Sequence, residues 1–267
     1  MEPSLKKHTT LICFAMFIIA MPLAWLTLNP LIRQFDDVWA DVVRYLVTVA
    51  ITILLMRLIW KKNVFSFKCP KLFKGLFTFG LVGLVGAVGA FVFSYEMVDV
   101  MPAIEMIVGV VLMNLAIAIS EEFLFRGVIL NVLLKAYSEK KKSIHSAVLV
   151  SCAIFGLRHF LNLITKPDAL IMTCAQAAFT FMAGTYLCAV YLRTKNIWVC
   201  VLIHFLEDFA VSLWPLFSSV AASSASTDIT VSNALGMVIL LIPYIVFAWF
   251  MLRDKKWQLS LLSELRT

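Results

Sequence analysis

Ionisable side chains interrupt the apolar sequence of this chain at three places. They are Glu121, Glu122 and Arg126 in the first, Arg158 and His159 in the second, and His204 and Asp208 in the third. A charge near the centre of a bilayer costs at least about 2.5–3.5 kcal/mol, so such residues either pair with one another or serve a function. We therefore expect the chemistry of the protein to lie at these three places.

The first place holds two adjacent acids and a base at helical spacing. Glu122 and Arg126 are four residues apart and share one face of a helix, whereas Glu121 is turned from Glu122 by about 100°. This spacing predicts an ion pair between Glu122 and Arg126, and it makes Glu121 the candidate general base or acid. The alternative is a buried triad that only fixes helix packing, but two acids with one base carry more charge than packing requires.

The second and third places contribute histidines. His204 and Asp208 are also four residues apart, so they can share a helix face and hydrogen-bond. A single buried histidine is more often a hydrogen-bonding residue between helices than a catalyst. His159 and His204, however, lie at depths similar to that of Glu121 in their predicted membrane spans. We therefore expect all three to converge on one polar cavity inside the membrane.

The residue types narrow the chemistry by elimination. The chain has no GxSxG nucleophile turn and no glycine-rich phosphate loop, which argues against a serine hydrolase and a nucleotide-binding protein. A zinc site built from these acids and histidines is an open alternative, but the chain has no HExxH motif, so no metal or cofactor is predicted. Water activated by a carboxylate and an imidazole fits the residues best, and the predicted reaction is hydrolysis of a peptide bond.

The composition places these residues in a membrane protein. Of the 267 residues, 62% are apolar or aromatic and 15% are charged, and the mean hydropathy is +0.93. Soluble domains have roughly 45–50% apolar and about 25% charged residues, so a soluble globule is excluded. Segments of about 17–25 apolar residues predict an all-α, polytopic membrane protein with about eight transmembrane helices in a single domain over residues 1–267. The predicted spans are 9–30, 38–60, 74–98, 103–134, 144–163, 168–192, 197–217 and 230–252.

The basic residues indicate the topology. The net charge is +7 and the isoelectric point about 9.1, but most Lys and Arg residues fall in alternate connections between the spans. This pattern predicts a multi-pass protein of the cell membrane with both termini in the cytoplasm and the lipid bilayer, not nucleic acid, as its partner. Residues 61–74 and the tail from Trp257 are predicted to lie along the inner membrane surface. Residues 218–233 are predicted to form an outer loop.

Two smaller features complete the expected architecture. The third span carries glycines at every third position, which predicts close packing against another helix. They are Gly80, Gly83, Gly86 and Gly89.

The six cysteines form no CxxC pair, and most lie in apolar segments, so we interpret them as reduced hydrophobic residues.

The three places together resemble a known family. The patterns EExxxR at Glu121, Glu122 and Arg126, FxxxH at Phe155 and His159, and HxxxN/D at His204 and Asp208 are similar to those of the CAAX-protease and bacteriocin-processing family, also called CPBP or Abi. Its members are intramembrane glutamic proteases. The resemblance covers about residues 103–217, with all motifs in the family's order and each on a separate span.

The resemblance implies a role for each residue. Glu121 and His159 would activate the water, His204 and Asp208 would act on the oxyanion side, and Glu122 and Arg126 would support the site. One position departs from the prenyl-protein branch, which has Asn where this chain has Asp208. Because an ionised Asp repels an oxyanion, we expect Asp208 to orient and charge His204 instead.

The predicted function is an intramembrane endopeptidase acting on a hydrophobic or membrane-anchored peptide. Bacterial relatives are linked to peptide maturation and bacteriocin immunity, so the sequence leaves the substrate open. Two alternatives remain at this point: a non-catalytic membrane protein of the same family that binds a partner or confers immunity, and a proton-coupled transporter that uses the same carboxylates.

Overall fold

The computed structural model describes residues 37–55, 57, 71–95, 98–99, 103–138, 143–164, 166–217 and 230–266. Helices account for most of these residues, and none of them forms a strand, which confirms the predicted all-α class. The predicted span 9–30, most of the surface segment 61–74 and most of the outer loop 218–233 lie outside the described residues. Contacts divide the chain into two compact units. We call them the Glu121 unit and the His159 unit, each after a candidate site residue that it contains. The single domain over residues 1–267 stays a prediction.

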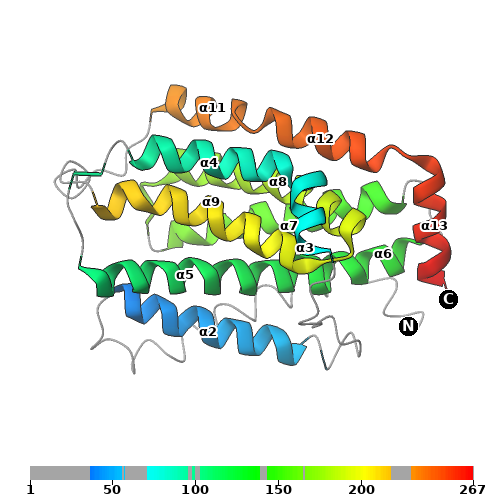
Figure 1. The fold of residues 1–267 in the computed structure, drawn as a ribbon, viewed down its shortest axis with the longest axis horizontal. Helices are drawn as coiled ribbons and strands as arrows, with labels where there is room; N and C mark the ends of the chain where they lie inside the picture. The colour runs from blue at the N-terminus through cyan, green and yellow to red at the C-terminus, as the bar shows by residue number, and fades with distance from the viewer. Residues whose placement is uncertain are drawn as a thin grey trace. The chain divides into compact units, whose positions relative to one another are not determined.

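The Glu121 unit comprises Ile12–Val128 and Asn196–Ala225. Its helices are α2 (Asp37–Leu55), α3 (Leu72–Thr78), α4 (Leu81–Tyr95), α5 (Ile104–Glu122) and α9 (Ile197–Phe217). Within this unit α2 lies along α5, and α9 packs against both α4 and α5 (Figure 1). Helix α5 is therefore held between α2 and α9, and this contact brings two of the ionisable places together.

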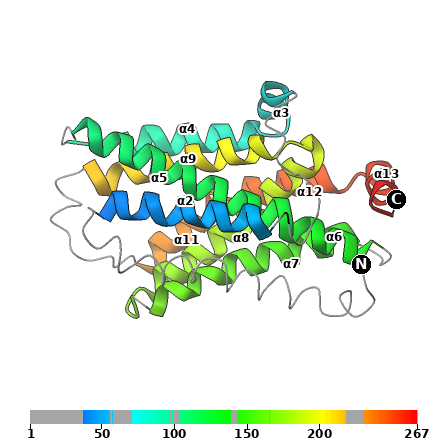
Figure 2. The ribbon, with the colours of Figure 1, turned by 90° about the horizontal axis from the view of Figure 1, so that it is seen from below.

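The His159 unit comprises Met1–Leu11, Ile129–Lys195 and Ser226–Thr267. Its elements are α6 (Asn131–Tyr137), α7 (Ser143–Arg158), the 3-10 helix η3 (His159–Ile164), α8 (Leu170–Thr194), α11 (Val231–Ile239), α12 (Ile242–Leu252) and α13 (Lys255–Arg266). Helix α8 is central, because it packs against α7, η3, α11 and α12. Figure 2 shows α7 and α8 side by side.

Four helical stretches among the described residues are long and apolar enough to cross a membrane: Ile104–Tyr137, Ile144–Ile164, Leu170–Thr194 and Val231–Leu252. The pair α3 and α4 would make a fifth span if it crosses as one bent unit. Helices α2 and α9 occupy their predicted ranges but are not among these stretches, so the predicted count of eight spans is not confirmed. Large apolar side chains such as Ile104 and Leu240 are more than three-quarters exposed, which suits contact with lipid.

Two of the predicted spans are interrupted by a short break in the helix. The axis bends by 77° between α3 and α4. At the bend, a Cβ on Gly80 would lie 2.9 Å from both Ile203 Cδ1 and the carbonyl oxygen of Leu76, so glycine permits the turn and the approach to α9. Between α11 and α12 the break precedes Pro243, which lies at the start of α12 and has no backbone N–H to donate.

The predicted small-residue face of the third span is confirmed only in part. Gly80 makes the close approach to α9, and Gly83 is buried in α4. Gly89 is different, because nothing lies within 4 Å of the position its Cβ would take. The face therefore ends before the last of the four glycines.

Helices α7 and α8 make a second close approach, at Gly156. A Cβ on this residue would lie 2.7 Å from the carbonyl oxygen of Ala177, which belongs to the backbone and cannot rotate away. Gly156→Ala is expected to lower the free energy of unfolding by about 1–3 kcal/mol, the usual cost of overpacking. Thermal unfolding in detergent measures the change. The matched control is Gly89→Ala, which should gain up to about 1 kcal/mol from helix propensity, and equal stability of the two variants would contradict the tight contact.

Candidate active site

The two adjacent acids lie at the end of α5 in the Glu121 unit. Glu121 and Glu122 are both buried, and the side chain of Arg126 is fully buried as well. Arg126 Nη1 donates a hydrogen bond of 2.7 Å to Glu122 Oε1. The ion pair predicted from the i,i+4 spacing is therefore confirmed. The other carboxylate oxygen, Glu122 Oε2, is buried and has no hydrogen-bond partner among the described residues.

A π-helix begins directly after these acids. Residues Phe123–Leu130 form the segment η2, with the wider hydrogen-bonding pattern of the π-helix, where the sequence predicts an ordinary helix. The N–H of Phe123, at the junction with α5, is shared between the carbonyl oxygens of Ile119 and Ser120. Turns of π-helix occur often at functional sites. Nothing in the residue types distinguishes this segment from α-helix, so sequence analysis missed it.

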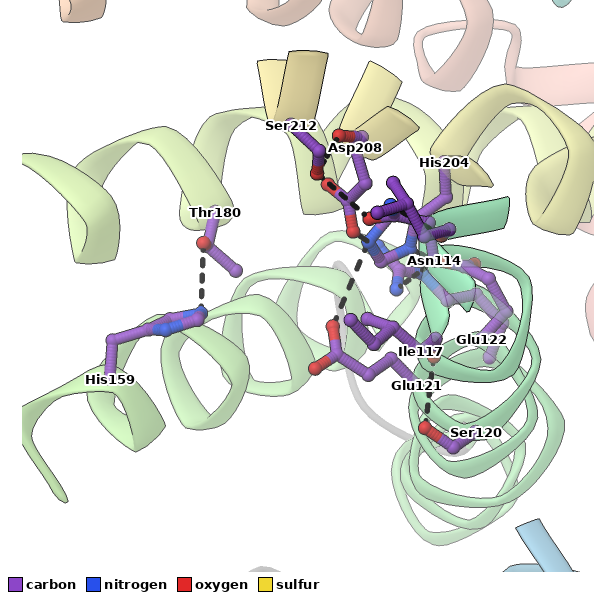
Figure 3. A network of polar contacts seen from close by, with 12 residues as sticks. Asn114, Ile117, Ser120, Glu121, Glu122, His159, Thr180, His204, Asp208 and Ser212 are labelled. Carbon is purple, nitrogen blue, oxygen red and sulfur yellow. Dashed lines mark hydrogen bonds and ion pairs between the residues drawn. The ribbon is translucent and has the colours of Figure 1, made fainter. Parts of the chain in front are cut away.

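His204 of α9 joins the pair on α5. Its Nδ1 lies 2.8 Å from Glu122 Oε1, the same oxygen that accepts from Arg126. Its Nε2 lies 3.2 Å from Asp208 Oδ2, one turn further along α9, and 3.7 Å from Glu121 Oε2 (Figure 3). The imidazole is thus bounded by three carboxylates, and the predicted proximity of His204 and Asp208 is confirmed.

The electrostatic balance of this cluster is acidic. Three carboxyl groups surround one guanidinium and one imidazole, and most of these side chains are buried. Both ring nitrogens of His204 face carboxylate oxygens. The ring can donate a hydrogen bond from each nitrogen only in its doubly protonated form. Asp208 is the most accessible member of the cluster, with 32% of its side chain exposed, against 7% for Glu121. A small polar reactant would therefore reach the cluster from the Asp208 side.

Asn114 and Ser212 form hydrogen bonds beside the cluster and were not predicted. Ser212 Oγ lies 2.7 Å from the carbonyl oxygen of Asp208 and 3.2 Å from Asn114 Oδ1, and Asn114 Nδ2 donates to Val110 O at 2.9 Å. The bond between Ser212 and Asn114 ties α9 to α5 (Figure 3). A buried Asn two helical turns before Glu121, and a Ser one turn after Asp208, are the sequence signals that could have identified them.

His159 belongs to the other unit. It is the first residue of η3, at the junction with α7, and its Nε2 lies 3.0 Å from Thr180 Oγ1 of α8 (Figure 3). The ring of Phe155, one turn earlier, lies with its centroid 6.1 Å from that of His159. Thr180 was not predicted either, because the contact joins residues 21 positions apart.

The order and content of these motifs agree with a family comparison. Residues 103–210 match the sequence model described as type II CAAX prenyl endopeptidase Rce1-like. The match covers less than half of the chain. The family predicted from the sequence is confirmed by this match, and it points to a protease of the CAAX type. No curated protein and no solved structure matches the chain.

The Rce1-like segment contains all the candidate site residues predicted from the sequence. It begins at Ala103, the N-cap of α5, and ends within α9, two residues after Asp208. Asn114 and Thr180 also lie inside it. Helices α2, α3 and α4 precede it, although α2 and α4 pack against its helices α5 and α9.

Metal ions in proteins are bound mainly by His, Cys, Asp and Glu side chains. In the described part of the chain, no group of three or more His, Cys, Asp or Glu side chains is arranged to hold a metal ion. His204 does lie near three carboxyl groups, which are those of Glu121, Glu122 and Asp208.

Proposed function

We propose that this protein is an intramembrane endopeptidase that hydrolyses a peptide bond in a hydrophobic or membrane-anchored peptide. The observation that carries the proposal is the buried cluster of Glu121, Glu122, Arg126, His204 and Asp208 within the Rce1-like segment. Apolar helices long enough to span a membrane support the location. The proposal places both termini in the cytoplasm of a multi-pass protein of the cell membrane.

In the proposed reaction, Glu121 accepts a proton from a water molecule while the water oxygen attacks the carbonyl carbon of the peptide. His159 assists this proton transfer. The tetrahedral intermediate then collapses as its C–N bond breaks, and the proton passes to the leaving amine. The products are a carboxylate and an amine, as in any peptide hydrolysis.

The remaining residues stabilise charge or hold the site. His204 donates a hydrogen bond from Nε2 to the developing oxyanion, the step that usually contributes most to such catalysis. Glu122 orients His204 through Nδ1, and Arg126 balances the charge of Glu122. Asp208 lies 3.2 Å from His204 Nε2 and keeps the ring positively charged until the oxyanion forms.

Asp208→Asn tests the role of this last carboxylate. An amide can still hydrogen-bond to His204 but cannot stabilise an imidazolium, so kcat is expected to fall by at least about 10²-fold. The rate of cleavage in proteoliposomes is the measurement, with protein abundance as the control for folding. A variant that kept most of the wild-type rate would show that residue 208 acts as an uncharged hydrogen-bonding group.

Removal of metal ions tests the activation of water. If Glu121 and His159 activate it without a metal, the cleavage rate should be unchanged after dialysis against a strong zinc chelator. The control is a zinc-dependent protease carried through the same dialysis. Loss of activity that zinc restores and magnesium does not would contradict the proposed mechanism.

The substrate is tested with two probes of stated chemistry. Purified protein in liposomes is offered an internally quenched peptide ending in a farnesylated CaaX motif, and the same peptide without the farnesyl group. Cleavage of the first probe alone supports a prenylated substrate, and cleavage of both supports a broader hydrophobic peptide substrate. Peptidomics of membranes from cells with the wild-type protein or Glu121→Gln then searches for natural substrates. If neither probe is cleaved and the two peptidomes are identical, the endopeptidase proposal is wrong.

A further inference from the structure

We infer that Thr180 is a positioning residue for His159, and that its hydroxyl group fixes the orientation and tautomer of the imidazole. This inference rests on the proposed function, in which His159 assists proton transfer to and from water. It adds a residue of α8 that lies outside the three motifs found in the sequence. All the contacts that carry it lie within the His159 unit.

The contact itself is short and protected. Thr180 Oγ1 and His159 Nε2 are 3.0 Å apart, and Thr180 is buried with 7% of its surface exposed. A hydrogen bond in such surroundings does not compete with bulk water, so it constrains the ring more strongly than an exposed one would. His159 itself is partly buried.

Contacts with α8 flank His159 on both sides in the sequence. Gly156 and Ala177 each lie one turn before the paired residues, and here α7 and α8 approach so closely that a Cβ on Gly156 would be 2.7 Å from Ala177 O. On the other side, Asn162 Nδ2 donates to Gln176 Oε1 at 3.1 Å. The segment that carries His159 is thus tied to α8 both before and after the histidine.

The position of His159 in its own segment explains why such a tie is needed. The residue lies where α7 ends and the 3-10 helix η3 begins. A change of helix type alters the direction in which the side chain leaves the backbone, and short 3-10 segments have poorer hydrogen-bond geometry than α-helices. A second helix that holds the ring compensates for this weaker local support.

The chemical consequence concerns the tautomer. A neutral imidazole donates through one nitrogen and accepts through the other. If the Thr180 hydroxyl donates to Nε2, the ring proton lies on Nδ1, and if it accepts, the proton lies on Nε2. In either case the second nitrogen is set to one role, and a general base or acid works only in the correct tautomer.

Thr180→Val is the variant that tests the inference, because it keeps the shape of the side chain and removes the hydroxyl group. With the farnesylated CaaX probe, kcat is expected to fall about 3- to 10-fold with little change in KM, as expected for loss of one hydrogen bond. The pH dependence of kcat should shift with it. Thr180→Ser restores the hydroxyl group and should return kcat to the wild-type value.

Thr185→Val is the matched control. Thr185 is a buried threonine on the same helix, but its hydroxyl donates to Phe181 O of its own backbone at 2.8 Å. Its replacement removes a hydroxyl group from α8 without touching His159, so kcat and the pH profile should stay as in the wild type. Equal effects of the Thr180 and Thr185 variants would show that the role of Thr180 is merely structural and would overturn the inference.

A spectroscopic measurement separates this inference from the proposed function. Nitrogen-15 NMR of histidine-labelled protein in nanodiscs reports the tautomer of each ring, and His159→Ala assigns the His159 signals. These signals should shift in Thr180→Val and not in Thr185→Val, whether or not the probe is cleaved. Unchanged signals in Thr180→Val would contradict the inference. Full activity of His159→Ala would contradict the proposed function instead.

Discussion

Glu121→Gln is expected to abolish cleavage while leaving the abundance and folding of the protein unchanged. Glutamine keeps the size and polarity of the side chain but cannot accept a proton from water, and loss of a general base typically costs about 10²–10⁴-fold in rate. The shortest contacts of the cluster involve Glu122, which lies 2.7–2.8 Å from Arg126 and His204, whereas Glu121 lies 3.7 Å from His204. The measurement is the rate of cleavage in proteoliposomes, normalised to the amount of folded protein.

Glu105→Gln is the control for this experiment. Glu105 lies in the first turn of the same helix, but its side chain is exposed. The same chemical change at this position should leave the cleavage rate within experimental error. Residual activity of Glu121→Gln near that of Glu105→Gln would show that another group activates the water.

Glu122→Ala is expected to act on stability more than on chemistry. The substitution leaves the guanidinium of Arg126 in the interior and removes the acceptor that holds His204 Nδ1. Breaking a buried ion pair by removing one partner costs about 3–5 kcal/mol, enough to lower the abundance of most proteins of this size. The free energy of unfolding in detergent and the steady-state amount in membranes measure the loss.

The double variant Glu122→Ala/Arg126→Met tests the cause of that loss. Removing both charges eliminates the buried, uncompensated guanidinium, so the double variant should be more stable than Glu122→Ala alone. Glu105→Ala, at an exposed position of α5, should change the unfolding free energy by less than about 0.5 kcal/mol. A double variant less stable than the single one would show that Arg126 serves packing beyond its pairing with Glu122.

Sequence reasoning succeeded where the interaction was local. Glu122 and Arg126, and likewise His204 and Asp208, are four residues apart on one helix, so helical geometry alone brings each pair together. The all-α class and the approximate bounds of α5, α7, α8 and α9 follow from hydropathy for a similar reason, because each helix forms from its own apolar segment.

Sequence reasoning failed where the local pattern of hydrogen bonds changed. The π-helix after Glu122 and the 3-10 helix at His159 consist of residues that α-helices also contain. The bend before α4 depends on Gly80 meeting Ile203, more than 100 residues later. Such irregularities arise when packing of distant segments outweighs the small differences in energy between helix types.

The sequence by itself determined which residues are ionisable, which of them share a helix face, and which family the segment of about residues 103–217 resembles. Only the tertiary structure decided that His204 bonds to Glu122, 82 residues away, that Ser212 reaches Asn114, and that Thr180 holds His159. The physical reason is that these contacts depend on how helices cross. A crossing is set by the fit of many side chains at once, including the close approach at Gly156, and no single spacing in the sequence encodes it.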